Sequence, residues 1–492
     1  MNRIVTQALL SALAAASFAF PASAQQNRDI VRPLEYAAPP PPVSWSPPVL
    51  HGKALPINLP TALRLVNART LDVAIATQRI AAANAQLDLA KVAWLPTITM
   101  GADYLRHDGR AQDSSGVIID PTRSSFMAGA GVNAIFTPSD AIFAPLAARQ
   151  IVRARLAERE TAANNTLLSV AEAYFNIQQA RGELVGAHVA VRHAEELARR
   201  TEKLAVSLVP PVEAVRARSE LARRKQAAHS AHERWQLASA DLIRILRLDP
   251  SSLIDPAEPP HLRVSLIEID QTADTLIPVG LRNRPELASQ QALIEATLQR
   301  LRQEKMRPLI PSLVLKGTGT NPPASLSVGT FGGGNDSVGR YGPRGDFEVQ
   351  IVWEFQNLLF GNRARIKERQ AENQATMLEL FRLQDNIAAE VAQAHAQAKS
   401  AANRLADAES GLKDAAESVD KNFQALSQTR RAGELIVLLV RPQEVIAAIQ
   451  TLAQAYSDYY GSVGDYNRAQ FRLYRALGYP AHFVTGCEPT LR

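Results

Sequence analysis

Two stretches of alternating apolar and polar residues, each set between long helical segments, constrain this 492-residue chain more than any other feature. The alternating runs lie at residues 98–104, 126–136, 313–318 and 347–355. A period of two is typical of a β-strand with one apolar and one polar face. The chain therefore predicts four strands, arranged as two hairpins.

The surrounding segments are rich in Ala, Leu, Arg, Glu and Gln, a composition typical of long helices. The same order of segments occurs twice, and Val170-Ala171-Glu172-Ala173 resembles residues 391–394, so we expect two internal structural repeats. We expect a signal peptide at 1–24, a proline-rich extended arm at 25–60 and a tail at 481–492. The first repeat, at 61–280, contains a helix, a strand hairpin at 96–136, a long helix at 141–206, a helix at 213–247 and a linker at 248–280. The second repeat, at 281–480, contains a helix, a strand hairpin at 311–356 with a glycine-rich loop at 321–345, a long helix at 361–430 and a helix at 444–478.

The N-terminus has the order of a secretory signal peptide. Arg3 precedes an apolar run at 8–20, and Ala22-Ser23-Ala24 supplies the small residues of a cleavage site. The run is shorter than the roughly 20 residues that a helix needs to span a bilayer. Charged or amide residues interrupt all later apolar segments, so we expect any membrane crossing to be made by strands.

Four strands cannot close into a barrel, and an open sheet in lipid would leave unpaired backbone groups at its edges. Three copies of the chain would supply twelve strands, an even number within the known range. The polar faces would then line a wet lumen, for which the candidates are Thr97, Thr99, Asp103, Asn133, Lys316, Glu348, Gln350 and Glu354. The alternative is a soluble sheet with one face on a core. Helices of about 66 residues, roughly 100 Å long, favour the membrane interpretation.

Composition and motifs argue against enzymes and nucleic-acid binders. The net charge of +6 is spread along helices instead of forming a basic stripe with aromatic residues. The single cysteine, Cys487, excludes an internal disulfide or a cysteine-based metal site. His229 and His232 lack the spacing of a metalloprotease motif, and the run of glycines at 332–334 lacks the Lys-Ser/Thr of a P-loop. We expect no catalytic, cofactor-binding or metal site.

From about Pro56 to Pro480 the chain resembles the TolC-type outer membrane factors, the outer membrane efflux protein family. The resemblance rests on Trp94-Leu95-Pro96, Leu309-Ile310-Pro311, Phe143, Phe360, Val170-Ala171-Glu172-Ala173-Tyr174 and Arg431-Ala432-Gly433. It implies a mixed α/β membrane protein, a homotrimer whose twelve-stranded β-barrel crosses the lipid of the Gram-negative outer membrane and continues as a long α-helical periplasmic barrel. It also implies a passive export channel that docks on a periplasmic adaptor (membrane fusion protein) and an inner-membrane pump.

In such channels the turns at the periplasmic tip close the tunnel, and the family pattern places an acidic residue after each turn. The counterparts here are Glu213 and Glu444, which lie 231 residues apart, as do Arg247 and Gly478. In a trimer these glutamates would form a ring that attracts cations. The alternative is that both are first-turn glutamates favoured by the helix dipole.

The second tip carries an apolar run where a water-exposed turn is expected. An exposed apolar patch usually marks a contact surface, so we expect this tip to dock an adaptor or to seal the closed tunnel. The candidates for adaptor docking at the tips are Ser207, Gly433, Leu435, Leu438 and Leu439. The alternative is packing against the neighbouring helices. The competing function for the whole chain is a soluble periplasmic coiled-coil adaptor or scaffold.

Overall fold

The computed structural model describes residues 53–120, 122–206, 208–316, 326, 328–432 and 435–480. The predicted signal peptide, most of the proline-rich arm, Cys487 and the predicted tail lie outside these residues. The chain forms two compact units. We call Met1–Val66, Leu167–Val279 and Glu390–Arg492 the tip-bearing unit, and Asn67–Thr166 and Gly280–Ala389 the sheet-bearing unit.

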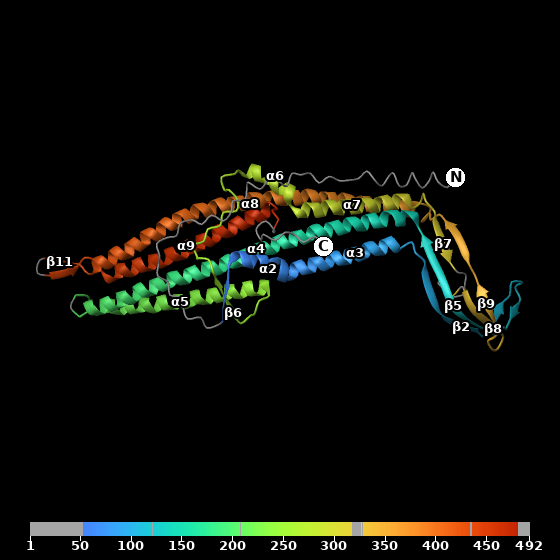
Figure 1. Ribbon diagram of the computed structural model, residues 1–492, viewed down its shortest axis with the longest axis horizontal. Coiled ribbons are helices and arrows are strands. Elements are labelled where there is room, and N and C mark those ends of the chain that lie inside the picture. The colour runs from blue at the N-terminus through green and yellow to red at the C-terminus, as the bar shows by residue number, and fades with distance from the viewer. Residues whose placement is uncertain are drawn as a thin grey trace. The chain divides into compact units, whose positions relative to one another are not determined.

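Helices dominate both units (Figure 1). Their bounds are α2 Leu59–Arg69, α3 Leu71–Val92, α4 Pro138–Leu204, α5 Pro211–Leu246, α6 Ala273–Asn283, α7 Pro285–Met306, α8 Phe360–Leu426 and α9 Pro442–Ala476. Both α4 and α8 have 67 residues and pass from the sheet-bearing into the tip-bearing unit. Both α5 and α9 begin with proline, whose fixed φ suits the first helical position.

The tip-bearing unit is held together where α4 approaches α9. Gly182 and Gly186 of α4 face Tyr460 and Tyr456 of α9, and an added Cβ would lie 2.3 Å and 2.4 Å from these side chains. The two tyrosine rings stack with an interplanar angle of 12°. These two glycines therefore make room on α4 for the two aromatic rings, because packed interiors leave no spare volume.

A small sheet and hydrogen bonds from buried side chains hold the segment that connects the two halves of the chain. β1 (Lys53–Ile57) pairs in parallel with β6 (Ser252–Pro256), a sheet that the sequence did not predict. Trp235 of α5 donates its indole N–H to the carbonyl of Ile254 at 3.0 Å. Further along, Asn467 of α9 accepts a hydrogen bond from the Val264 amide at 2.8 Å and donates one to the Leu262 carbonyl at 2.7 Å.

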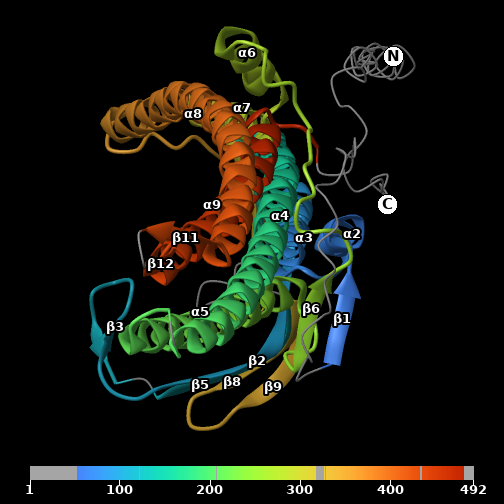
Figure 2. The same ribbon diagram turned by 90° about the vertical axis from the view of Figure 1, so that its left-hand side faces the viewer.

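The sheet-bearing unit contains a curled sheet, visible in Figures 1 and 2. Its strands are β2 Thr97–His107, β5 Arg123–Phe136, β7 Ser312–Lys316, β8 Val328–Gly334, β9 Gly339–Gly345 and β10 Glu348–Val352, and a small hairpin of β3 Ala111–Gln112 and β4 Ile118–Ile119 stands apart. One edge of β5 pairs with β2, while its other edge pairs first with β8 and then with β7. β8 and β7 in turn pair with β9 and β10. The six strands thus occupy four rows.

The prediction of a glycine-rich loop at 321–345 was wrong over most of its described part, which forms β8 and β9. Glycine has no side chain to contribute to an alternating pattern, so these strands carry almost no periodic signal. Their backbones nevertheless need glycine, since a Cβ on Gly329 would lie 2.1 Å from the carbonyl oxygen of Ala128 on β5. These glycines are therefore explained by the close approach of the β5 and β8 backbones, and not by an alternating pattern of side chains.

Candidate functional site

One cross-strand row joins four of the predicted lumen residues. Thr97 lies opposite Asn133, Asn133 opposite Lys316, and Lys316 opposite Glu348. Directly opposed residues project from the same face of a sheet. The Lys316 ammonium lies 3.5 Å from the Glu348 carboxylate, so the row also contains an ion pair.

The strand register extends this polar face. Thr99 and Asp103 lie on the same side of β2 as Thr97, because successive side chains alternate. Gln350 shares the side of Glu348 on β10, whereas Glu354 lies beyond the end of that strand. The face is not uniformly polar: Ile135, two residues beyond Asn133, is exposed.

The opposite face of the sheet is apolar and uncovered. Met100 on β2 is 83% exposed, and Val349 and Ile351 on β10 are more than half exposed. Transferring such side chains from water to an apolar environment is favourable by about 1.5–3 kcal/mol each. Large apolar side chains exposed on this face are typical of a surface that contacts an apolar partner or an apolar medium.

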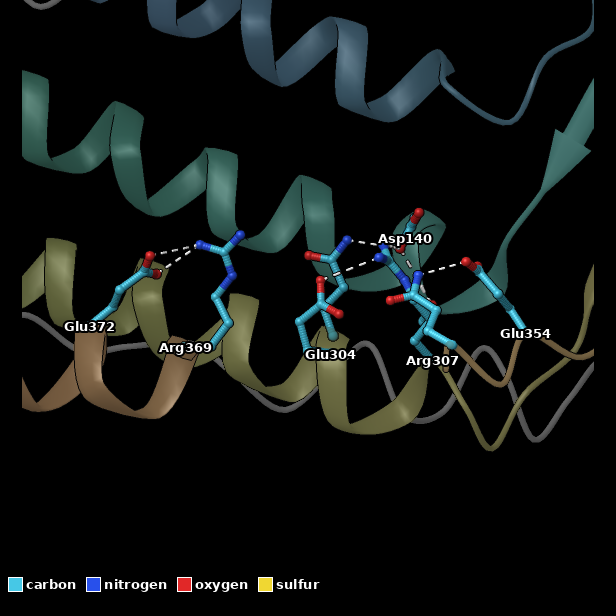
Figure 3. A network of polar contacts seen from close by, with 9 residues as sticks. Asp140, Glu304, Arg307, Glu354, Arg369 and Glu372 are labelled. Atoms are coloured by element: carbon cyan, nitrogen blue, oxygen red, sulfur yellow. Dashed lines mark hydrogen bonds and ion pairs between the residues drawn. The ribbon is translucent and has the colours of Figure 1, made fainter. Parts of the chain in front are cut away.

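A network of charges lies where the strands join the helices (Figure 3). Arg307, at the end of α7, donates to Asp140 in the first turn of α4 at 2.8 Å and lies 3.3 Å from Glu304. Burial alone would lower the pKa of Arg307, but the hydrogen bond and charge of Asp140, with Glu304 and Glu354, outweigh it and raise this pKa. Arg307 therefore stays charged and ties α7 to the start of α4.

The two predicted gate residues occupy unlike surroundings in the tip-bearing unit. Glu213 is 14% exposed, and one carboxylate oxygen accepts a hydrogen bond from Arg216 at 2.6 Å. Glu444 is exposed, and among the described residues its carboxylate has no hydrogen bond or ion pair. Both are in the first turn of their helices, where the dipole favours an anion.

The second tip is a β-hairpin where the sequence suggested a turn between helices. β11 (Thr429–Ala432) pairs with β12 (Leu435–Leu438), so α8 ends at Leu426, four residues before the predicted end. Leu438 is half-buried and packs against a hydrophobic cluster formed by α4, α5, α8 and α9. Leu439 points outward and is 53% exposed. Ser207 and Gly433 lie outside the described residues, as does the side chain of Leu435.

The first tip carries an apolar surface that the sequence interpretation missed. Val206 is 85% exposed, and Leu208, Val212 and Val215 are also exposed. The signal was available in the run Ala205-Val206-Ser207-Leu208-Val209, which is shorter and less apolar than the run in the second tip. Both tips thus present aliphatic side chains to solvent.

Within the described part of the chain, no group of three or more His, Cys, Asp or Glu side chains is arranged to hold a metal ion. Among the same residues, no helix combines the length and apolar character that crossing a membrane requires.

Comparison with known proteins gives a consistent picture. Residues 62–246 match the family model of the outer membrane efflux protein. A search of curated proteins by sequence gave no match. Three solved structures share the fold at low sequence identity.

The outer-membrane channel OprN has 16% identity over 85% of this chain and 89% of its own, with a TM-score of 0.67. The outer membrane protein VceC of Vibrio cholerae has 15% identity over 86% and 96%, with a TM-score of 0.65. The open state of the Neisseria gonorrhoeae MtrE outer membrane channel has 17% identity over 86% and 89%, with a TM-score of 0.63. The chain therefore resembles the outer membrane efflux proteins, in sequence over residues 62–246 and in fold over most of its length.

Proposed function

We propose that this chain is the outer-membrane channel of a tripartite efflux system or a type I secretion system. Three copies would each contribute four rows of strands to a twelve-stranded barrel, and the helices would continue it into the periplasm. The channel would conduct substrates passively, from a periplasmic adaptor and an inner-membrane pump to the exterior. The two halves of the chain would act as structural repeats within this assembly.

The two-faced sheet with open edges carries the proposal. Among the described residues, β2 pairs only with β5, β10 only with β7 and β9 only with β8, so each side of the sheet ends in an unpaired strand. Such an edge in lipid costs several kcal/mol for each unsatisfied backbone group. Joining the edges of neighbouring copies satisfies these groups, while the apolar face meets lipid and the polar row faces water.

Planar-bilayer recording tests the proposal directly. Purified mature protein should form trimers in detergent and give discrete single-channel conductance steps. A soluble periplasmic adaptor or scaffold, the competing function, would be recovered without detergent and would give no steps. That outcome would reject the channel.

Replacing both gate candidates with glutamine should weaken cation selectivity. A ring of up to six carboxylates attracts cations, and Glu444 lacks the arginine partner that Glu213 has. We therefore expect Glu444→Gln to move the reversal potential under a KCl gradient more than Glu213→Gln does. If the double variant keeps the wild-type reversal potential and conductance, these glutamates serve only as helix caps.

Leu439→Asp should weaken adaptor binding about tenfold or more, because it puts a charge into an exposed apolar contact surface. Trimer yield should be unchanged, since Leu439 is exposed. Leu438→Asp should instead destabilise the fold, because Leu438 packs against the hydrophobic cluster. Gln443→Asp, an exposed polar position nearby, is the charge control. If the Leu439→Asp variant pulls down as much adaptor as the wild type does, Leu439 is not part of the docking surface.

A further inference from the structure

A cleft of about 510 Å³ lies between α7 and α8 in the sheet-bearing unit. It opens beside the network of Figure 3. Its charged lining consists of Arg300, Glu304, Arg307, Arg365, Glu368 and Arg369. Four cations therefore face two anions within one cleft.

Two of the four arginines are neutralised by neighbours. Arg307 is paired with Asp140 and Glu304. Arg369 donates from one nitrogen to both oxygens of Glu372, at 3.0 Å and 2.7 Å. These pairs are built into the junction between helices and strands.

The other two arginines are free. Arg300 on α7 and Arg365 on α8 are both exposed, and neither forms an ion pair or hydrogen bond with any described residue. A guanidinium group offers planar, paired donors that match carboxylate, sulfonate or phosphate oxygens. Glu368, the other carboxylate of the lining, balances one of these two charges, so the cleft keeps an excess positive charge that suits an anion.

The cleft lies near the end of the sheet where the strands join the helices. Arg307, in its wall, is paired with Asp140 in the first turn of α4, and the hydroxyl oxygens of Thr137, just after β5, and Ser312, the first residue of β7, are 3.0 Å apart. Arg302, two residues after Arg300, projects about 160° away around the helix and is exposed on another side of α7. Arg302 therefore lies outside the lining of the cleft, although it belongs to the same turn of α7 as Arg300.

We propose that Arg300 and Arg365 form a contact site for the anionic groups of molecules that pass through the channel. The site rests on the proposed function, because in a trimer it would occur three times and place six unpaired cations where the helices meet the barrel. Its ligands are phosphate, sulfonate or carboxylate groups on the exported molecules. It would favour anions, whereas the proposed glutamate ring of the tips would favour cations.

Block of single channels by inorganic tripolyphosphate tests the site. The wild-type channel in KCl should be blocked, and higher salt should relieve the block because screening weakens it. Arg300→Gln/Arg365→Gln should raise the blocking concentration about tenfold, as expected for the loss of two nearby unit charges per chain. Arg302→Gln/Arg363→Gln, which removes two unpaired arginines from the same turns of the same helices, should leave it unchanged.

Each result decides between the two proposals. Wild-type channels that tripolyphosphate does not block, or a block weakened equally by both double variants, would overturn the arginine site and leave the channel standing. A wild-type protein that forms no channels would reject the channel itself. If Arg300→Gln/Arg365→Gln assembles poorly, the single substitutions and Arg300→Lys/Arg365→Lys take its place: lysine should keep most of the block, and each single glutamine should lose part of it.

Discussion

Met100→Arg should nearly abolish assembled protein in the outer membrane. Met100 lies on the apolar face of β2, opposite Ala130, and is the most exposed large hydrophobic residue of that strand. An arginine facing lipid near the middle of a barrel costs about 2–4 kcal/mol, and three chains would each bear this cost. The measurement is the amount of SDS-resistant trimer in the membrane fraction.

Gly101→Arg is the matched control. Gly101 is the next residue, its added side chain would project from the polar face, and a Cβ there meets nothing within 4 Å. This variant should assemble like the wild type, because its charge would enter a water-filled lumen. If Met100→Arg assembles normally while Gly101→Arg fails, the faces of the sheet are assigned the wrong way round.

The sequence could predict the strands whose apolar and polar residues alternate, but not those that are specified by other contacts. The alternation around Ile98 and Met100 located β2 and the side of the strand that holds Thr97 and Asp103, because side-chain alternation is local. β8 and β9 were missed because their glycines have no side chains that could form an alternating apolar and polar pattern. In that region the fold depends on close backbone contact, which a single sequence does not display.

The candidate site shows the same division. The gate candidates Glu213 and Glu444 came from the family pattern and from their equal spacing in the two halves of the chain, and Arg216, three residues after Glu213, is a local signal that Glu444 lacks. The ion pair of Asp140 with Arg307 joins residues 167 positions apart. The cleft beside it likewise requires α7 and α8 to be packed together, so no local pattern could have indicated Arg300 and Arg365.

The arrangement of charges gives the two proposed sites opposite preferences. Glu444 presents an uncompensated carboxylate in the tip-bearing unit, and Arg300 and Arg365 present uncompensated guanidinium groups in the sheet-bearing unit. A channel with both would treat the two ends of a zwitterionic or amphiphilic molecule differently. The glutamine substitutions at each site should therefore shift selectivity in opposite directions.

Asn467→Leu should destabilise the tip-bearing unit by about 2–6 kcal/mol. Asn467 is fully buried, and its amide satisfies the Val264 N–H and the Leu262 carbonyl, two backbone groups that leucine would leave buried without partners. Each such group costs about 1–3 kcal/mol. Amide exchange in residues 262–267, measured by mass spectrometry, should accelerate at least about thirtyfold, which corresponds to the lower bound.

Gln236→Leu supplies the comparison, because it makes a similar amide-to-leucine change at the position 231 residues earlier in the chain. Gln236 is exposed on α5, and its one recorded side-chain contact is with His232 at 3.2 Å. A surface change of this kind is usually within about 0.5 kcal/mol of neutral. Equal exchange rates in the two variants would mean that the segment 262–267 is held by its apolar contacts, such as the buried Leu262 and Val264, and not by the amide of Asn467.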